Sequence, residues 1–327
     1  RHTRYISVTG VQTCALPIFN VVRSTGSIKK AAKELGMSET TLRRRIGTFG
    51  AGRVSDGRPL GETLRINHNE GRVDLSIENG TVVVFSDAHY EPGVRTTAHR
   101  ALVAMIEQLK PVAVICNGDA VDNGSISRYP RIGWDNKPTV AQELAAVEQA
   151  LGEIENASGA ATLVWPLGNH DARFETYLAA HAPQYEGVQG FSLKDRFPLW
   201  KPCWTCWIND ETCVTHFYHT GMHAGWNNLM KGQVNYVSSH RHTPEVRAYT
   251  NAAGKTIYGV DTGTLADALS GHNRDYQQGR HGNHRSAFAV LTYRDGHLLM
   301  PELVQKYDED HVQFRGHVLN ADTMEVV

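Results

Sequence analysis

The sequence lacks long apolar runs and is poor in cysteine. No stretch of its 327 residues approaches the roughly 20 consecutive apolar residues that a membrane-spanning helix needs, so we expect no membrane partner. The five cysteines are odd in number and scattered, which is not the pattern of a disulfide framework and favours a reducing, cytoplasmic compartment. They are Cys14, Cys116, Cys203, Cys206 and Cys213. The formal net charge of −1 gives no overall field that would mark a nucleic-acid or membrane partner.

Histidine, in contrast, is abundant. Seventeen histidines occur in a chain that is 41% hydrophobic and 20% charged, an ordinary composition for one large domain or for one large and one small domain. Histidine is the commonest metal ligand and the general acid or base of neutral pH. The positions of the histidines therefore carry most of the functional information in this chain.

The first residues do not look native. Residues 8–18, VTGVQTCALPI, resemble a translated sequencing-library adapter, so we expect residues 1–18 to be an artefact and native sequence to begin near Phe19. Cys14 would then be ignored, leaving four cysteines. Without that resemblance, the apolar part after a leading arginine would read as a weak signal peptide.

Residues 19–48 have the pattern of a small helix-turn-helix segment. A short amphipathic helix over 27–35 ends at Gly36, and Ser38 can cap a second helix. In a helix-turn-helix the second helix enters the major groove, so residues 27–46 would bind DNA. The side chains facing the DNA would be Thr40, Thr41, Arg43, Arg44 and Arg45. The alternative is a helical hairpin that only packs on the main domain.

The rest of the chain predicts an α/β domain. Residues 49–79 form a linker with one edge strand, and residues 80–327 form the main domain. Three continuous apolar strands at 81–85, 112–116 and 161–165 alternate with helices near 94–109, 139–156 and from Ala172, which indicates parallel β-α-β units. Further strands are expected at 211–218, 234–238, 245–250, 256–261, 286–293 and 297–304. We therefore predict a two-sheet α/β/β/α sandwich.

Each of the three buried strands ends in a polar cluster. FSDAHY follows the first strand, CNGDAVD the second and PLGNHDAR the third. The carboxyl ends of strands in an open α/β sheet are where ligand sites form, so these loops should meet. Later strands add the histidines of ETCVTHFYHTGMHAG (211–225) and of VNYVSSHRHTPEV (234–246). One such cluster is weak, but the whole series in this order is a strong signal for a metal site.

At these residues the sequence resembles the calcineurin-like metallophosphoesterase superfamily, over about residues 80–305. The family pattern D-x-H, G-D, G-N-H-(D/E), H and G-H-x-H is matched by Asp87 and His89, Gly118-Asp119, 168–171, the histidines of 216–223, and 239–242. The stretches HTGMHAGWNN (219–228) and YGVDTGTLAD (258–267) look closest to members carried by phages and prophages. The resemblance implies a two-sheet fold around two divalent metals.

The resemblance also implies a ligand set and a mechanism. Asp119 would bridge two metals; Asp87, His89 and His242 would complete the first site. Asn169, His240 and one histidine of the fourth block would complete the second. This mixture of oxygens and imidazoles suits Mn²⁺, Fe, Zn²⁺, Ni²⁺ or Co²⁺. A hydroxide bridging the metals would attack phosphorus, and His170, oriented by Asp171, would protonate the leaving alkoxide.

The fourth block leaves its ligand open among three histidines. In the family this ligand stands at a strand end, often just before a glycine, which favours His219 ahead of Thr220 and Gly221. His223 is the second choice and would otherwise contact the substrate phosphate. His216 would lie inside the strand as a hydrogen-bonded structural residue.

Two residues depart from the family pattern. Asn123 stands where members acting on phosphoproteins carry a phosphate-gripping arginine, which argues against a protein phosphatase. Arg173 is our candidate for the missing substrate contact, with Arg95 and Arg128 as alternatives. Ser239 stands where the family usually has glycine, a change we expect to be tolerated because serine adopts most turn conformations with negative φ.

Two other clusters carry no predicted chemistry. PCWTCW (202–207) with Cys213 has no second pair at zinc-finger spacing, and we expect buried thiols there. HGNHRS (281–286) repeats the letters GNH without a preceding strand, and we expect a loop that lines the substrate cleft.

The sequence thus predicts a metal-dependent hydrolase of phosphate esters. The DNA-binding pattern at 27–46 tilts the choice towards diesters, including nucleic acid. The rival reading is a DNA-binding phage or prophage regulator whose phosphoesterase domain is a catalytically silent scaffold. The complete ligand series argues against that rival, because a metal site that is no longer used for catalysis would have lost some of these side chains.

Overall fold

The computed structural model describes residue 21 and residues 24–42, 70–129, 137–267 and 282–327. It divides into two compact units, Arg1–Asn67 and His68–Val327. No helix in these described ranges is both long and apolar enough to cross a membrane. Residues 1–18 and the arginines at 43–45, on which two of our predictions depend, lie outside the described residues.

In the described part of the small unit, residues 21 and 24–25 are helical, and two further helical segments joined by a turn follow them. Helix α2 (Ile28–Glu34) is followed by helical residues at 39–42. The hydroxyl of Ser38 accepts a hydrogen bond from the backbone N–H of Thr41 at 3.1 Å, so Ser38 caps the second segment as predicted. The apolar side chains of both segments form their own buried cluster, made of Ile28, Ala31, Ala32 and Leu42.

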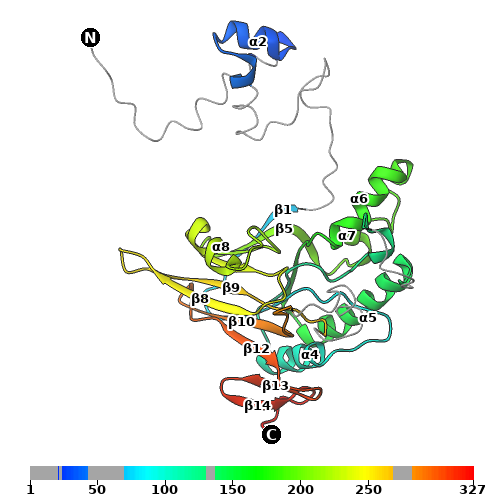
Figure 1. The fold of residues 1–327 in the computed structure, drawn as a ribbon, viewed down its shortest axis with the longest axis vertical. Coiled ribbons are helices and arrows are strands. Elements are labelled where there is room, and N and C mark those ends of the chain that lie inside the picture. Colours follow the sequence, from blue (N-terminus) through cyan, green and yellow to red (C-terminus); the bar gives the residue numbers. More distant parts are fainter. Residues whose placement is uncertain (1–20, 22–23, 43–69, 130–136, 268–281) are drawn as a thin grey trace. The chain divides into compact units, whose positions relative to one another are not determined.

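The large unit is built on one hydrogen-bonded path of strands (Figure 1). Its centre is the parallel series β2 (Gly80–Phe85), β3 (Ala113–Cys116), β4 (Thr162–Pro166) and β5 (Lys201–Ile208). Beyond β5 follow β6 (Thr212–Val214), β7 (Asn235–Ser238), β9 (Thr256–Asp261) and β8 (Glu245–Thr250). Beyond β2 follow β10 (Ala287–Arg294), β12 (Glu302–Lys306), β13 (His311–Phe314) and β14 (His317–Asn320). Two further strands pair beside this path, β1 (Glu70–Leu75) with β5 and β11 (His297–Leu298) with β10.

Helices connect these strands and cover them. They are α4 (Thr97–Leu109), α5 (Val140–Ser158), α6 (Asp171–His181), α7 (Leu193–Arg196) and α8 (Ala224–Gly232), with short 3-10 turns η1 (Gly124–Ile126) and η2 (Pro183–Tyr185). Helices α4 and α5 lie side by side, and α8 packs on β7, β8 and β9 (Figure 1). A capping box at Thr139 and Gln142 begins α5. The predicted order of three strands and three helices over 80–181 is confirmed.

Two apolar cores show how the strand path is arranged. Alternate residues of β2 point to opposite faces, so Val83 packs in a core with α4 and α5 while Val82 packs in a second core. The second core joins side chains of β2, β3 and β4 to Val214, Val237 and Val260 of β6, β7 and β9. The path therefore folds over on itself into two facing layers.

Our prediction of two sheets needs one correction of detail. The two layers remain connected through β5, whose first residues pair with β4 and whose last residues pair with β6. Strand β5 is an addition to the predicted strands; its sequence, KPCWTCWI, has no continuous apolar run of the kind that marks β2, β3 and β4. Its cysteine thiols are free and buried, as expected. The predicted edge strand is β1, and its pairing with β5 places residues 70–75 in the large unit.

Candidate metal centre

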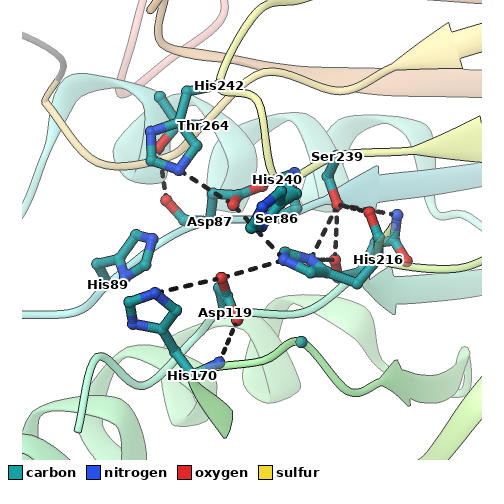
Figure 2. A network of polar contacts seen from close by, with 12 residues as sticks. Ser86, Asp87, His89, Asp119, His170, His216, Ser239, His240, His242 and Thr264 are labelled. Atoms are coloured by element: carbon teal, nitrogen blue, oxygen red, sulfur yellow. Dashed lines mark hydrogen bonds and ion pairs between the residues drawn. The ribbon is translucent and has the colours of Figure 1, made fainter. Parts of the chain in front are cut away.

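The polar loops after the strands meet at one edge of the sheet (Figure 2). The loop after β2 brings Asp87 and His89, the loop after β3 brings Asp119, and the end of β4 leads to His170. His216 follows β6, and His240 and His242 follow β7. The predicted convergence of these loops is therefore found, although they come from sequence positions more than 150 residues apart.

The side chains at this edge form three groups whose possible ligand atoms lie within 4.8 Å of one another. The first group is Asp87, His89 and His242. The second group is Asp119, His216 and His240. The third group is His89, Asp122 and His170, which shares His89 with the first.

The first group joins one carboxylate to two imidazoles. Nε2 of His242 lies 3.1 Å from Oδ1 of Asp87, and the rings of His89 and His242 are 5.4 Å apart between centroids. Burial alone would raise the pKa of Asp87, but the imidazoles of His242 and His216 outweigh burial and lower that pKa to about 2. This carboxylate is therefore an anion at neutral pH.

The second group is the most buried part of the centre. Nε2 of His216 lies 3.0 Å from Oδ2 of Asp119, and both side chains are almost fully buried. Burial opposes charge on either group, but each stabilises the charge of the other: the pKa of Asp119 falls well below its usual range, and Asp119 and Asp87 raise the pKa of His216 to about 10. The ring of His240 stands 5.2 Å from that of His216.

The structure brings His216, and not the preferred His219, to this group. Strand β6 ends at Val214, so His216 stands just past the strand end, where we expected the ligand to be. His219 lies further along and is in none of the three groups; its backbone N–H donates to Asn228, its ring contacts Tyr218, and its Nε2 is buried without a hydrogen-bond partner among the described residues. His223 is exposed at the start of α8. Our choice of His219 rested on a strand running to 218, which is four residues too long.

His170 has a carboxylate partner, but it is not the neighbouring Asp171. Nδ1 of His170 lies 2.7 Å from Oδ1 of Asp122, and this contact raises the pKa of His170 even though burial opposes the shift. Nδ1 of His89 lies 3.4 Å from the same Asp122 oxygen. Asp122 belongs to the second polar cluster, CNGDAVD, but the sequence analysis predicted no role for it.

Asp171 instead ties the loops together. Its carboxylate accepts backbone N–H groups of Asp119, Ala120, Val121 and Gly168, and the indole N–H of Trp165, at 2.8 to 3.1 Å. The first residue of α6 thus points back at the turn after β3. A fully buried carboxylate satisfied by several N–H donors fixes the backbone on which Asp119 stands.

Backbone strain is concentrated at the same residues. Asp87, His89, Asp119, His240 and His242 all have positive φ, between 40° and 74°. Left-handed conformations of non-glycine residues cost about 1–3 kcal/mol each and persist where the surroundings impose them, often at functional sites. Close packing imposes them here: a Cβ on Gly118 would overlap the ring of His216, and a Cβ on Gly168 would overlap Asp119.

The residues present fit divalent metal ions. Two buried carboxylates and four imidazoles converge, and Oδ1 of Asn169 is a buried oxygen with no hydrogen-bond partner among the described residues. Buried polar atoms without a partner are rare and require an explanation. The backbone N–H of the next residue, His170, donates to Oδ1 of Asp119 at 2.8 Å, so Asn169 belongs to the loop that adjoins the second group, where the resemblance to the family implied a ligand.

Comparison with known sequences agrees with this geometry. Residues 80–320 match the profile of the calcineurin-like phosphoesterase family. The chain belongs to that family. Residues 22–49 match a second profile, that of the bacterial regulatory proteins of the Fis family. No curated protein gives a significant match.

Among solved structures, this phosphoesterase family member is similar to a conserved uncharacterized protein from Streptococcus pneumoniae TIGR4, described as a predicted phosphoesterase. The match covers 77% of this chain and 94% of that chain, with 13% sequence identity and a TM-score of 0.28.

Asn123 stands where phosphoprotein-acting members resembling this chain would carry an arginine, and the structure brings Arg173 to the centre. Arg173 donates to the backbone oxygen of Asp122 at 3.0 Å and lies 3.1 Å from Nε2 of His170. Arg95 pairs with Glu153, and Arg128 lies over the ring of Tyr129. Among the three arginines that we considered, Arg173 therefore stands at the centre.

Two smaller predictions concern the edges of this phosphoesterase centre. Ser239 is not among the described residues with positive φ, so serine is tolerated at the family's glycine position, as expected. Residues 282–285 form a loop, and the ring of His284 lies 4.7 Å from that of His242. The loop that we expected to line the substrate cleft thus borders the first group.

Proposed function

We propose that this protein hydrolyses phosphate esters with two divalent metal ions. Asp87, His89 and His242 would hold the first ion, and Asn169, His216 and His240 would hold the second. Asp119 would serve as a ligand to both. The observation that carries this proposal is the pair of separate carboxylate–imidazole groups on one sheet edge, together with the amide oxygen of Asn169, which is buried and has no hydrogen-bond partner among the described residues.

The donor set decides which cations suit this centre. Carboxylate and amide oxygens combined with imidazoles favour Mn²⁺, Fe, Zn²⁺, Ni²⁺ or Co²⁺. Such ions, when bound, supply Lewis acidity at phosphorus and lower the pKa of a bound water. The protein supplies the fixed geometry, since the strained loop backbones and the buried Asp171 leave the ligands little freedom to rearrange.

The remaining residues at the centre bind the substrate and move the proton. His170 donates a proton to the leaving alkoxide, and Asp122 orients its ring and stabilises its charged form. Nη2 of Arg173 lies 3.1 Å from Nε2 of His170. A substrate phosphate would take over the N–H groups of Arg173 and so free Nε2 to carry the proton.

We favour phosphodiesters as substrates, including those of nucleic acids. The support for this choice is the match of residues 22–49 to a family of bacterial DNA regulators, within the chain that also carries the phosphoesterase family match. The other candidate, a DNA-binding phage or prophage regulator with a silent phosphoesterase scaffold, draws on the same match. The two candidates differ in one measurable respect, which is turnover.

The test measures hydrolysis of bis-p-nitrophenyl phosphate and of p-nitrophenyl phosphate by the full chain, with Mn²⁺ and with each alternative metal. We expect metal-dependent turnover that is lost with chelator and that is faster for the diester. Faster turnover of the monoester would overturn the diester preference alone. No turnover with any metal, in a protein that still binds duplex DNA, would favour the regulator.

A further inference from the structure

Ser239 is buried next to the metal centre, at the point where β7 ends. Only 2% of the residue is exposed. Its hydroxyl oxygen lies 3.1 Å from Nδ1 of His216, 2.9 Å from the backbone oxygen of Asn117 and 3.1 Å from the backbone oxygen of His216 (Figure 2). The side-chain amide of Asn117 donates to the same hydroxyl at 3.2 Å. One small side chain therefore links the loop after β3, the loop after β6 and the loop after β7.

These contacts fix which nitrogen of His216 faces the centre. Nδ1 of His216 lies 2.7 Å from the backbone oxygen of Asn117, which can only accept a hydrogen bond, so Nδ1 carries a proton. Nε2 then points at Asp119, in the second group. The close packing of the ring on Gly118 leaves it little room to turn away. Partners of this kind orient metal-binding imidazoles and commonly change metal affinity about 10–100-fold when they are removed.

We propose that Ser239 is a positioning residue for His216. Its hydroxyl holds the Asn117 carbonyl and the imidazole in register, so that Nε2 is presented to the second metal site. The glycine that the family usually has at this position lacks any group that could do this. This inference rests on the proposed function, because it concerns the affinity of one of the two proposed metal sites.

The neighbouring Ser238 provides a matched control. It precedes Ser239 as the last residue of β7 and is equally buried, with 1% of the residue exposed. Its hydroxyl contacts the amide of Asn228 at 3.2 Å and the backbone oxygen of Val260 at 3.3 Å, away from His216. Ser238→Ala therefore removes a buried hydroxyl from β7 without removing a contact to the metal-binding imidazole.

The experiment titrates Co²⁺ into the metal-free wild-type protein and into the Ser239→Gly, Ser239→Ala and Ser238→Ala variants, followed by calorimetry and by the cobalt absorption spectrum. Thermal unfolding of the metal-free proteins checks that each is folded. We expect one of the two cobalt-binding constants to fall about tenfold or more in both Ser239 variants, with an altered spectrum. The Ser238→Ala variant should match the wild type.

Two results would count against these ideas, and they are distinct. Wild-type protein that binds no cobalt at all would overturn the proposed function itself. Two intact wild-type sites, with unchanged constants and spectra in both Ser239 variants, would overturn only the positioning role. Equal weakening by the Ser238 and Ser239 variants would also overturn that role, because it would reflect the loss of any buried hydroxyl on β7.

Discussion

His216 and Asp119 face each other at 3.0 Å, from Nε2 to Oδ2, between the loops after β6 and β3. Burial alone would make both groups neutral, yet each holds the other in its charged form. A cation bound here would replace the proton on Nε2 of His216 and keep Asp119 ionised. The charges of the pair are therefore suited to a cation, which would take the place of the imidazole proton.

Replacing His216 should affect metal binding far more than replacing His219. His216 stands in the second group, whereas His219 is in none of the three groups. We expect His216→Ala to lose about one metal equivalent per chain and to reduce kcat at least about 100-fold. His219→Ala should keep the metal content and the kcat of the wild type. Elemental analysis after dialysis, together with diesterase rates, measures this. A loss of metal in His219→Ala alone would restore our first choice of ligand.

Asp122→Asn should change the pH profile as well as the rate. Asp122 raises the pKa of His170, and the amide in its place would lower that pKa again. A general acid acts when protonated, so activity is lost as pH rises through its pKa. The alkaline limb of kcat should therefore move to lower pH in the variant, and kcat should fall about 10–100-fold. An unmoved limb would show that Asp122 does not act through His170.

Asp171→Ala should instead destabilise the fold. The change would leave four backbone N–H groups and one indole N–H without their buried acceptor. Breaking a buried network of this kind costs about 3 kcal/mol or more. Urea unfolding of the metal-free protein measures the loss. A variant with wild-type stability but reduced kcat would point back to the catalytic role that the sequence suggested.

Glu143 should make stability depend on pH. Burial, and to a lesser degree the charge of Asp122, raise the pKa of Glu143 to about 7 from an ordinary value of 4.5. Because the folded state binds this proton more tightly, the resulting stability is complete below pH 4.5 and is lost as pH rises to about 7.

Glu143→Gln should abolish this dependence, because glutamine does not titrate. Over that range we expect the free energy of unfolding of the metal-free wild type to fall by about 3 kcal/mol relative to the variant. Urea unfolding at a series of pH values compares the two. Parallel curves for wild type and variant would show that Glu143 ionises normally in the fold.

The sequence predicted the centre well where the chemistry depends on strand ends. Five of the predicted ligands follow strands that are recognisable as apolar runs, and the structure brings these residues together. They are Asp87, His89, Asp119, His240 and His242. The errors have a common physical origin. An apolar run does not show where its strand stops. The sequence predicts a strand through residue 218, which would contain His216, but β6 ends at Val214.

Contacts between side chains of different loops could not be predicted from the sequence for a related reason. Asp171 is next to His170 in the chain, but it begins α6 and turns towards the loop after β3. Asp122 is far from His170 in the chain and yet contacts its ring. The sequence prediction gave His170 its chain neighbour Asp171 as partner. The packing of the two strand-end loops gives it Asp122 instead.

The most direct test of the two-metal account is the metal content and turnover of Asp119→Asn beside the wild type. Asp119 is the proposed bridge, so its loss should weaken both sites together. We predict two metal equivalents per chain and diester hydrolysis in the wild type, with less than one equivalent and no measurable turnover in Asp119→Asn. Unchanged metal content and turnover in the variant would contradict the account and place the bridge elsewhere.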